Sequence, residues 1–70
     1  MPPRKPPDFA AILTRERGRA ALSREQLADA AGITRESVRL YETGKRRPTW
    51  DAIQSLAKAL KVPTDTFRDS

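Results

Sequence analysis

Two runs of apolar residues at helical spacing occupy the first half of the chain. The inward positions of the first run are Phe9, Ile12 and Leu13, three and four positions apart, on a helix that Asp8 can cap. Ser23 and Gln26 form a capping-box pattern, in which each side chain satisfies a free backbone N–H, and they open a second helix. The inward positions of this helix are Leu27, Ala28 and Ala31. Gly32 ends it, because glycine readily adopts the left-handed conformation of a tight turn.

Two more helices and a short turn follow. Thr34 can cap a third helix, which Gly44 ends, and Thr49 can cap a fourth. The inward positions of the third are Val38, Tyr41 and Glu42, and those of the fourth are Trp50, Ile53, Leu56, Ala57 and Leu60. Pro63 opens a last short turn that holds Phe67. No segment alternates as a strand would, so the pattern predicts an all-α fold of five short helices.

The first seven residues differ in composition from the rest. Residues 1–7 hold four of the six prolines, and proline lacks a backbone N–H and disfavours helix in the residue before it. We therefore expect an extended arm at residues 1–7 and a single domain at residues 8–70. Arg4 and Lys5 are candidate contacts of this arm to a polyanionic partner, and a solubilising tail is the alternative.

Charge and composition narrow the possible functions. Fourteen lysines and arginines against nine acids give a net charge of +5, and residues 15–47 hold nine of those bases and five of the acids. Such a region is typical of a polyanion-binding surface, although a solvated face is the plain alternative. The chain has no histidine and no cysteine, so we expect no metal, no cofactor and no enzyme. The lack of disulfides and of a membrane span predicts a cytoplasmic, nucleoid-associated protein with no membrane partner.

The segment from residue 24 to residue 43 gives the most specific signal. Two short helices joined by a glycine turn of three or four residues form a helix-turn-helix. Ala28 is small enough to let the helices cross closely, and Gly32 relieves the turn. Val38 and Tyr41 fill the space between the helices. These four residues stand in register within fourteen positions, which predicts a helix-turn-helix here.

With these residues the chain resembles the lambda-repressor-like helix-turn-helix DNA-binding domains, also called Cro/cI-type or XRE-like. The resemblance covers about residues 9–67 and rests on Leu22-Ser23-Arg24-Glu25-Gln26-Leu27-Ala28, Gly32-Ile33-Thr34, Val38, Tyr41-Glu42-Thr43-Gly44-Lys45, Pro48 and Leu60-Lys61-Val62. It implies a five-helix regulator of transcription, repressor-like, whose third helix at about residues 34–43 lies in the major groove of double-stranded DNA. It also implies a homodimer reading half-sites about 34 Å apart. Seventy residues leave no room for a ligand-sensing domain, so we expect no small-molecule ligand. The chain departs from the family at Ala21, where glycine is usual, and at Arg24, where glutamine is common.

The outward face of the third helix supplies the candidates for base contacts. They are Arg35, Glu36, Ser37, Arg39 and Leu40. Arg35 lies in the first turn, where relatives contact base edges, and arginine suits guanine O6 and N7; a phosphate or solvent contact is the alternative. Glu36 either accepts a hydrogen bond from cytosine N4 or pairs with Arg39 at i+3 and orients it. Leu40 either meets a thymine methyl or packs at the boundary of the core.

A second group of side chains is expected to contact DNA phosphates. The candidates are Arg24, Thr43, Lys45, Arg46 and Arg47. Arg24 opens the second helix, whose free N–H groups and dipole favour a phosphate oxygen. The resemblance places the loop at residues 45–47 beside the DNA backbone, where contacts add affinity without direct sequence information. For any single loop residue the alternative is an exposed basic turn.

The last predictions concern one pair of charged residues and the surface of dimer contact. Arg17 and Glu42 fall on inward faces, where an unpaired charge is costly, so we predict that they pair, as relatives' residues do. The resemblance places the dimer contact in the last helix, which makes Val62 and Phe67 candidates; burial within the monomer is the alternative. A protein-interaction or antitoxin-like module that retains the fold is the competing function.

Overall fold

Four α-helices and one 3-10 turn make up residues 9–67, the part of the chain that this computed structural model describes. The elements are α1 (Phe9–Arg19), α2 (Arg24–Ala31), α3 (Arg35–Glu42), α4 (Trp50–Leu60) and the 3-10 turn η1 (Thr64–Phe67). Residues 9–67 contain no strand, so the all-α prediction is confirmed. The predicted cap Asp8 and the arm with Arg4 and Lys5 lie outside the described residues.

The fifth element differs from the helix that the sequence predicted. η1 is four residues long, and the N–H of Thr66 donates to the carbonyl of Pro63 at 3.0 Å, an i to i+3 bond. The short segment after Pro63 therefore closes as a 3-10 turn, which suits runs too short for an α-helix.

The predicted helix caps form at three of the four helices. Ser23 Oγ accepts from the N–H of Gln26 at 3.0 Å, and the Gln26 side chain accepts in return from the N–H of Ser23 at 2.8 Å. Thr34 and Thr49 cap α3 and α4 by accepting from backbone N–H groups three residues on. Gly32 ends α2 with φ +71°, the left-handed region that glycine tolerates best. The local sequence thus sets where α2, α3 and α4 begin.

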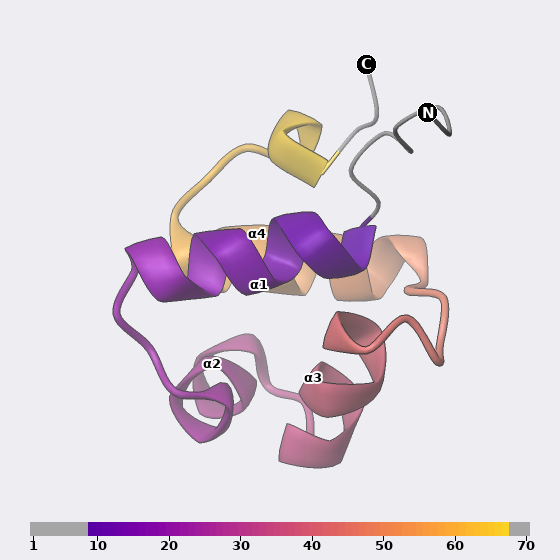
Figure 1. The fold of residues 1–70 in the computed structure, drawn as a ribbon. Helices are drawn as coiled ribbons and strands as arrows, with labels where there is room; N and C mark the ends of the chain where they lie inside the picture. Colours follow the sequence, from indigo (N-terminus) through magenta and orange to yellow (C-terminus); the bar gives the residue numbers. More distant parts are fainter. Residues whose placement is uncertain (1–8, 68–70) are drawn as a thin grey trace, which may run out of the picture.

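The helices are arranged in two groups. In Figure 1, α2 and α3 lie below α1 and α4, and η1 lies above them. α2 and α3 pack on each other, α1 packs on α3, α2 packs on α4, and η1 contacts both α1 and α4. Each helix of the α2–α3 pair therefore packs against one longer helix, α2 against α4 and α3 against α1. The opposite side of the pair faces outward.

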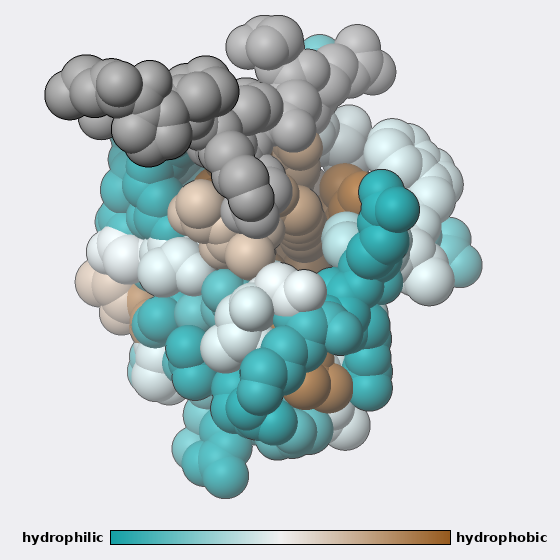
Figure 2. All heavy atoms as spheres, turned by 45° about the vertical axis from the view of Figure 1, so that its right-hand side comes forward, coloured by the Kyte–Doolittle hydropathy of each residue, from teal (hydrophilic) through white to brown (hydrophobic). Residues whose placement is uncertain are grey.

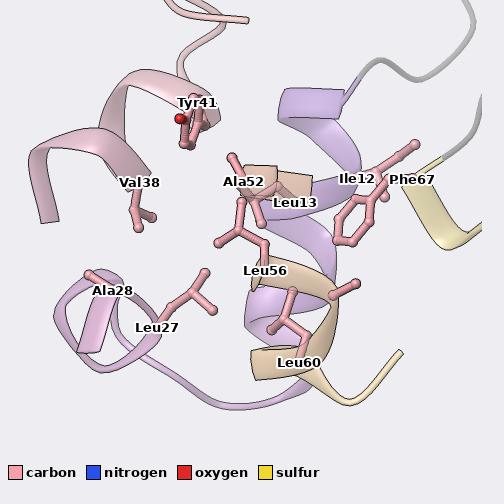
Figure 3. Packing of buried hydrophobic residues seen from close by; sticks show 11 residues of the cluster. Ile12, Leu13, Leu27, Ala28, Val38, Tyr41, Ala52, Leu56, Leu60 and Phe67 are labelled. Carbon is pink, nitrogen blue, oxygen red and sulfur yellow. The ribbon is translucent and has the colours of Figure 1, made fainter. Parts of the chain in front are cut away.

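The core is apolar and draws on every element. It consists of Ile12, Leu13, Leu27, Ala28, Val38, Tyr41, Ala52, Leu56, Ala57, Leu60 and Phe67. Figure 3 shows Leu13, Leu27 and Leu56 converging, with Val38 pointing inward from α3. At one edge the Phe9 ring stacks on Phe67 with 5.1 Å between centroids. Phe67 is 8% exposed, which favours burial within the monomer over a dimer contact, and Val62 is half-buried.

Trp50 corrects the sequence prediction, which placed it in the core, because the residue is 60% exposed. Trp50 is the first residue of α4 and lies on the flank of the buried stripe of Ala52, Leu56 and Leu60. A surface hollow of about 190 Å³ adjoins the indole, lined also by Ile53, Thr64, Asp65 and Phe67. Helical phase put Trp50 near the core, but η1 does not cover this end of the helix.

Two of the connections contain a non-glycine residue in the left-handed region. Ala21 (φ +57°) lies between α1 and α2, and Lys61 (φ +59°) follows α4. Ala21 is the position where the resemblance leads one to expect glycine. α1 ends at Arg19, and the chain turns at Ala21. This alanine is strained, because its Cβ disfavours the left-handed conformation.

Candidate nucleic-acid interface

The turn between α2 and α3 holds the two helices close together. Beyond the cap at Gly32, the N–H of Ile33 donates to the carbonyl of Ala28 at 3.0 Å. Ala28 is 2% exposed and Val38 is fully buried, so a small residue on α2 and an apolar one on α3 meet at the crossing. These are the contacts that the helix-turn-helix pattern predicted, and they fix which face of α3 points outward.

The outward face of α3 carries the residues predicted to contact bases. Arg35 is exposed and forms no ion pair or side-chain hydrogen bond within residues 9–67. Glu36 is exposed as well, whereas Ser37, Arg39 and Leu40 are half-buried. Of the two arginines in this set, Arg35 is the one whose donors are all available within residues 9–67.

Glu36 and Arg39 pair with each other along one turn of α3. Arg39 donates from Nε to Glu36 Oε2 at 3.0 Å and from Nη2 to Glu36 Oε1. The Glu36 side chain is 61% exposed, and the Arg39 side chain is 41% exposed. The hydrogen bond from Arg39 is the main cause that lowers the pKa of Glu36, and Glu36 in turn raises the pKa of Arg39. Of the two readings of Glu36, this structure contains the pair with Arg39.

The residues after α3 are anchored to it unequally. Arg46 donates from Nη1 to Ser37 Oγ at 3.1 Å, and its guanidinium lies 6.0 Å from the centroid of the Tyr41 ring. The Thr43 hydroxyl donates to the carbonyl of Arg39 at 2.9 Å. Lys45 and Arg47 are exposed. Arg46 is exposed like its two neighbours, but it is held against the outward side of α3 by these contacts.

A buried cluster closes the other end of α3. Arg17 donates from Nε to Glu42 Oε2 at 2.6 Å and from Nη2 to Oε1 at 3.1 Å. Its Nη1 donates to the carbonyl of Leu22 at 2.9 Å. The Glu42 side chain exposes no surface, and that of Arg17 is 21% exposed. The two residues predicted to pair are in contact, and they join α1 to α3.

Arg24 is the third member of this cluster, and sequence reasoning did not identify it as a partner of Glu42. Its Nε donates to Glu42 Oε1 at 3.1 Å, and its side chain is 39% exposed. The only sequence signal was the arginine at a position where relatives commonly have glutamine. Glu16 was also missed: it is 6% exposed and pairs with Arg15 and Arg19 at 3.1 and 3.7 Å.

A hollow of about 520 Å³ brings base and phosphate candidates together at the start of α2 and α3. Its lining residues are Arg17, Ser23, Arg24, Glu25, Arg35, Glu36 and Arg39. Hydrophilic residues cover much of the lower part of the molecule in Figure 2, the part that α2 and α3 form. Arg24 of α2 and Arg35 and Arg39 of α3 therefore point their charge into one shared surface, which suits a polyanion.

Within residues 9–67 no group of acidic side chains is arranged to hold a metal ion. None of the helices described is long and apolar enough to cross a membrane.

Comparison with known proteins agrees with this geometry. The model of the family described as "Helix-turn-helix domain" matches residues 8–69. The restriction-modification controller protein C.AhdI from Aeromonas hydrophila is 32% identical, with a TM-score of 0.84; the match covers 86% of this chain and 91% of that one. No curated protein matches the chain by sequence.

Two further solved structures share the fold at lower identity. The P22 c2 repressor, solved in complex with a synthetic operator, is 16% identical with a TM-score of 0.81, over 87% of this chain and 92% of that one. The Streptomyces albus enzyme HEPD, solved with 2-hydroxyethylphosphonate and Fe(II), is 24% identical with a TM-score of 0.86. That match covers 96% of this chain but 15% of the enzyme, so it concerns one small part of the enzyme.

Proposed function

The chain belongs to the helix-turn-helix domain family, and from this premise we propose that it regulates transcription by binding double-stranded DNA. The observation that carries the proposal is the shared surface in which Arg24, Arg35 and Arg39 line one hollow at the start of α2 and α3. A module that had given up DNA would have no need for these arginines on one side. The controller and repressor relatives support the same conclusion.

We propose that α3 enters the major groove and that its outward residues meet base edges. Arg35 leads this set, because its guanidinium is exposed and unpaired within residues 9–67 and so offers both donors that guanine O6 and N7 need. Glu36, Ser37, Arg39 and Leu40 lie on the same helix. The half-buried Leu40 can offer a methyl group to thymine without leaving the core boundary.

Phosphate contacts are assigned to Arg24, Thr43, Lys45, Arg46 and Arg47. The hydrogen bond from Arg24 Nε to Glu42 leaves both terminal amino groups of Arg24 for a phosphate oxygen. Lys45 and Arg47 are exposed in the loop that follows α3. Arg4 and Lys5 would add contacts from the arm, and deletion of residues 1–7 tests them through the affinity and its salt dependence.

The regulator is proposed to act as a homodimer on DNA, in the cytoplasm at the nucleoid, without a cofactor. A dimer reads two half-sites about one helical turn apart, so its operator is a palindrome. Since Phe67 packs in the monomer core, the half-buried Val62 is the remaining sequence-predicted contact.

Selection from a random duplex library at two salt concentrations tests this function. We expect enrichment of a palindrome and an affinity that falls steeply with salt, because each phosphate contact releases counterions. Weak binding without enrichment would favour the protein-interaction or antitoxin-like module instead.

A further inference from the structure

We propose that Glu36 is a positioning residue for base recognition: its carboxylate holds Arg39 by one edge and presents the other edge of the guanidinium to a guanine. The inference rests on the proposed binding of DNA through α3. It assigns the acidic side chain on a basic surface a part in specificity.

The geometry of the pair leaves the required edge open. Arginine carries five N–H donors in a rigid planar fork. Glu36 occupies Nε and one donor of Nη2, which form the side-on edge of Arg39. The end-on edge, formed by Nη1 and the second donor of Nη2, has the spacing that matches O6 and N7 of guanine. Arg39 can therefore hold Glu36 and a guanine at the same time.

Because Glu36 orients Arg39 before DNA binds, Arg39 loses less conformational entropy when it contacts a base. A free arginine on a helix surface loses several rotatable torsions when it binds, and that loss reduces affinity. The two hydrogen bonds to Glu36 already restrict Arg39, which is 41% exposed, to one direction. Arg35 has no such partner within residues 9–67, so the two outward arginines of α3 differ in how strongly they are ordered before binding.

The charge of Glu36 also affects how tightly the chain binds DNA of other sequences. A carboxylate on the DNA-facing surface is repelled by phosphates of any sequence, which weakens non-specific binding. At the correct site, the guanine contact of Arg39 compensates for that repulsion. Glu36 therefore raises the ratio of specific to non-specific affinity, which is the quantity that specificity measures.

A set of four variants tests the assignment by the base preference that each selects. They are Glu36→Ala, Arg39→Ala, the double variant and the matched control Glu25→Ala. Glu25 is the second residue of α2, as Glu36 is of α3; it lines the same hollow and forms no ion pair with another of the residues 9–67. Library selection gives the preferred base at each position, and binding to the selected operator and to a random duplex gives the ratio. Thermal melting checks that each variant is folded.

We expect Glu36→Ala and Arg39→Ala to relax the same base pair and to lower the ratio about tenfold. The double variant should be no worse than Arg39→Ala, because the two residues act as one unit. Both glutamate variants should bind random DNA more tightly, but Glu25→Ala should leave the selected sequence unchanged.

Three outcomes overturn the inference. If Glu36→Ala relaxes a different base pair from Arg39→Ala, Glu36 reads cytosine directly. If Glu36→Ala selects the wild-type sequence, the pair is a surface ion pair without a part in recognition. If the wild-type chain itself enriches no sequence, the proposed function fails and the inference fails with it.

Discussion

Helix α3 carries a glutamate paired with arginine near each end, and the two clusters differ in burial. Near the start, Glu36 pairs with Arg39 at the surface, where the Glu36 side chain is 61% exposed and that of Arg39 is 41% exposed. At the end, the Glu42 side chain exposes no surface and is shared by Arg17 of α1 and Arg24 of α2. The same chemistry therefore serves two purposes: water screens the first pair, whereas the second must be satisfied for the helices to pack.

The largest expected effect is on stability at the buried cluster. Glu42→Ala removes the acceptor of two arginines and should lower the free energy of unfolding by about 3–5 kcal/mol. The matched change at the exposed cluster, Glu36→Ala, should leave the free energy of unfolding nearly unchanged, because water screens the pair. Urea unfolding measures both. Equal losses would show that burial does not distinguish the two clusters.

Arg17→Met tests the buried cluster from its other side. The change removes two hydrogen bonds to Glu42 and one to the carbonyl of Leu22, while Arg24 stays as a partner of Glu42. We expect a loss of about 3 kcal/mol, at the lower end of the range for a broken buried pair. The melting temperature should fall by roughly 10–20 °C. An unchanged melting temperature would rule out a structural role for the pair.

Substitutions on the exposed surface of α3 and the loop after it should change DNA binding and leave stability unchanged. Arg35→Ala should cost about 1–3 kcal/mol of affinity for the selected operator and relax one base position, with unfolding unchanged. Its matched control is Lys45→Ala, which should weaken binding to all sequences alike and reduce the salt slope by about one. Titrations on operator and random duplexes measure both. A uniform loss for Arg35→Ala would assign Arg35 to a phosphate instead.

Ala21 offers a smaller test, at the turn that Arg17 spans. The N–H of Leu22 donates to the carbonyl of Arg17 at 3.2 Å, so the strained alanine lies inside a closed turn. Ala21→Gly should stabilise the chain by about 0.5–1 kcal/mol, since relief of left-handed strain exceeds the added flexibility of the unfolded chain. The neighbouring change Ala20→Gly, at a residue without positive φ, should destabilise it. Chemical denaturation of both variants checks the sign.

The smallest effect is a pH dependence at the exposed pair. Arg39 lowers the folded-state pKa of Glu36, so the pair contributes stability above the ordinary pKa of a glutamate. That contribution is lost as the pH falls below the ordinary pKa of a glutamate and through the lowered folded-state pKa. Melting of the wild type and Glu36→Gln between about pH 3 and pH 7 should therefore show a small difference that disappears at the acidic end. A difference that persists there would contradict the pairing.

The local parts of the fold were predictable because short-range chemistry determines them. The Ser23–Gln26 box, the caps at Thr34 and Thr49 and the left-handed Gly32 each involve residues within a few positions of one another. The buried leucines followed from helical phase. Trp50 did not, because phase gives the direction of a side chain but not whether another element reaches far enough to cover it.

The candidate site divides in the same way. The outward faces of α3 follow from which of its residues are apolar, so their direction was predictable. The sharing of Glu42 by Arg17 and Arg24 was not, because it depends on where three helices meet in space. The spacing of Glu36 and Arg39 allowed a pair but could not select it over a cytosine contact, since side-chain torsions decide between them.

The exposure of Trp50 gives the chain a built-in optical reporter. It is the only tryptophan, and 60% of its side chain already faces water in the folded monomer. Its fluorescence should therefore change little when the core melts, and should shift to the blue when another surface excludes water from the indole. A blue shift with rising protein concentration would therefore show that a second copy covers the start of α4, separately from the unfolding that circular dichroism detects.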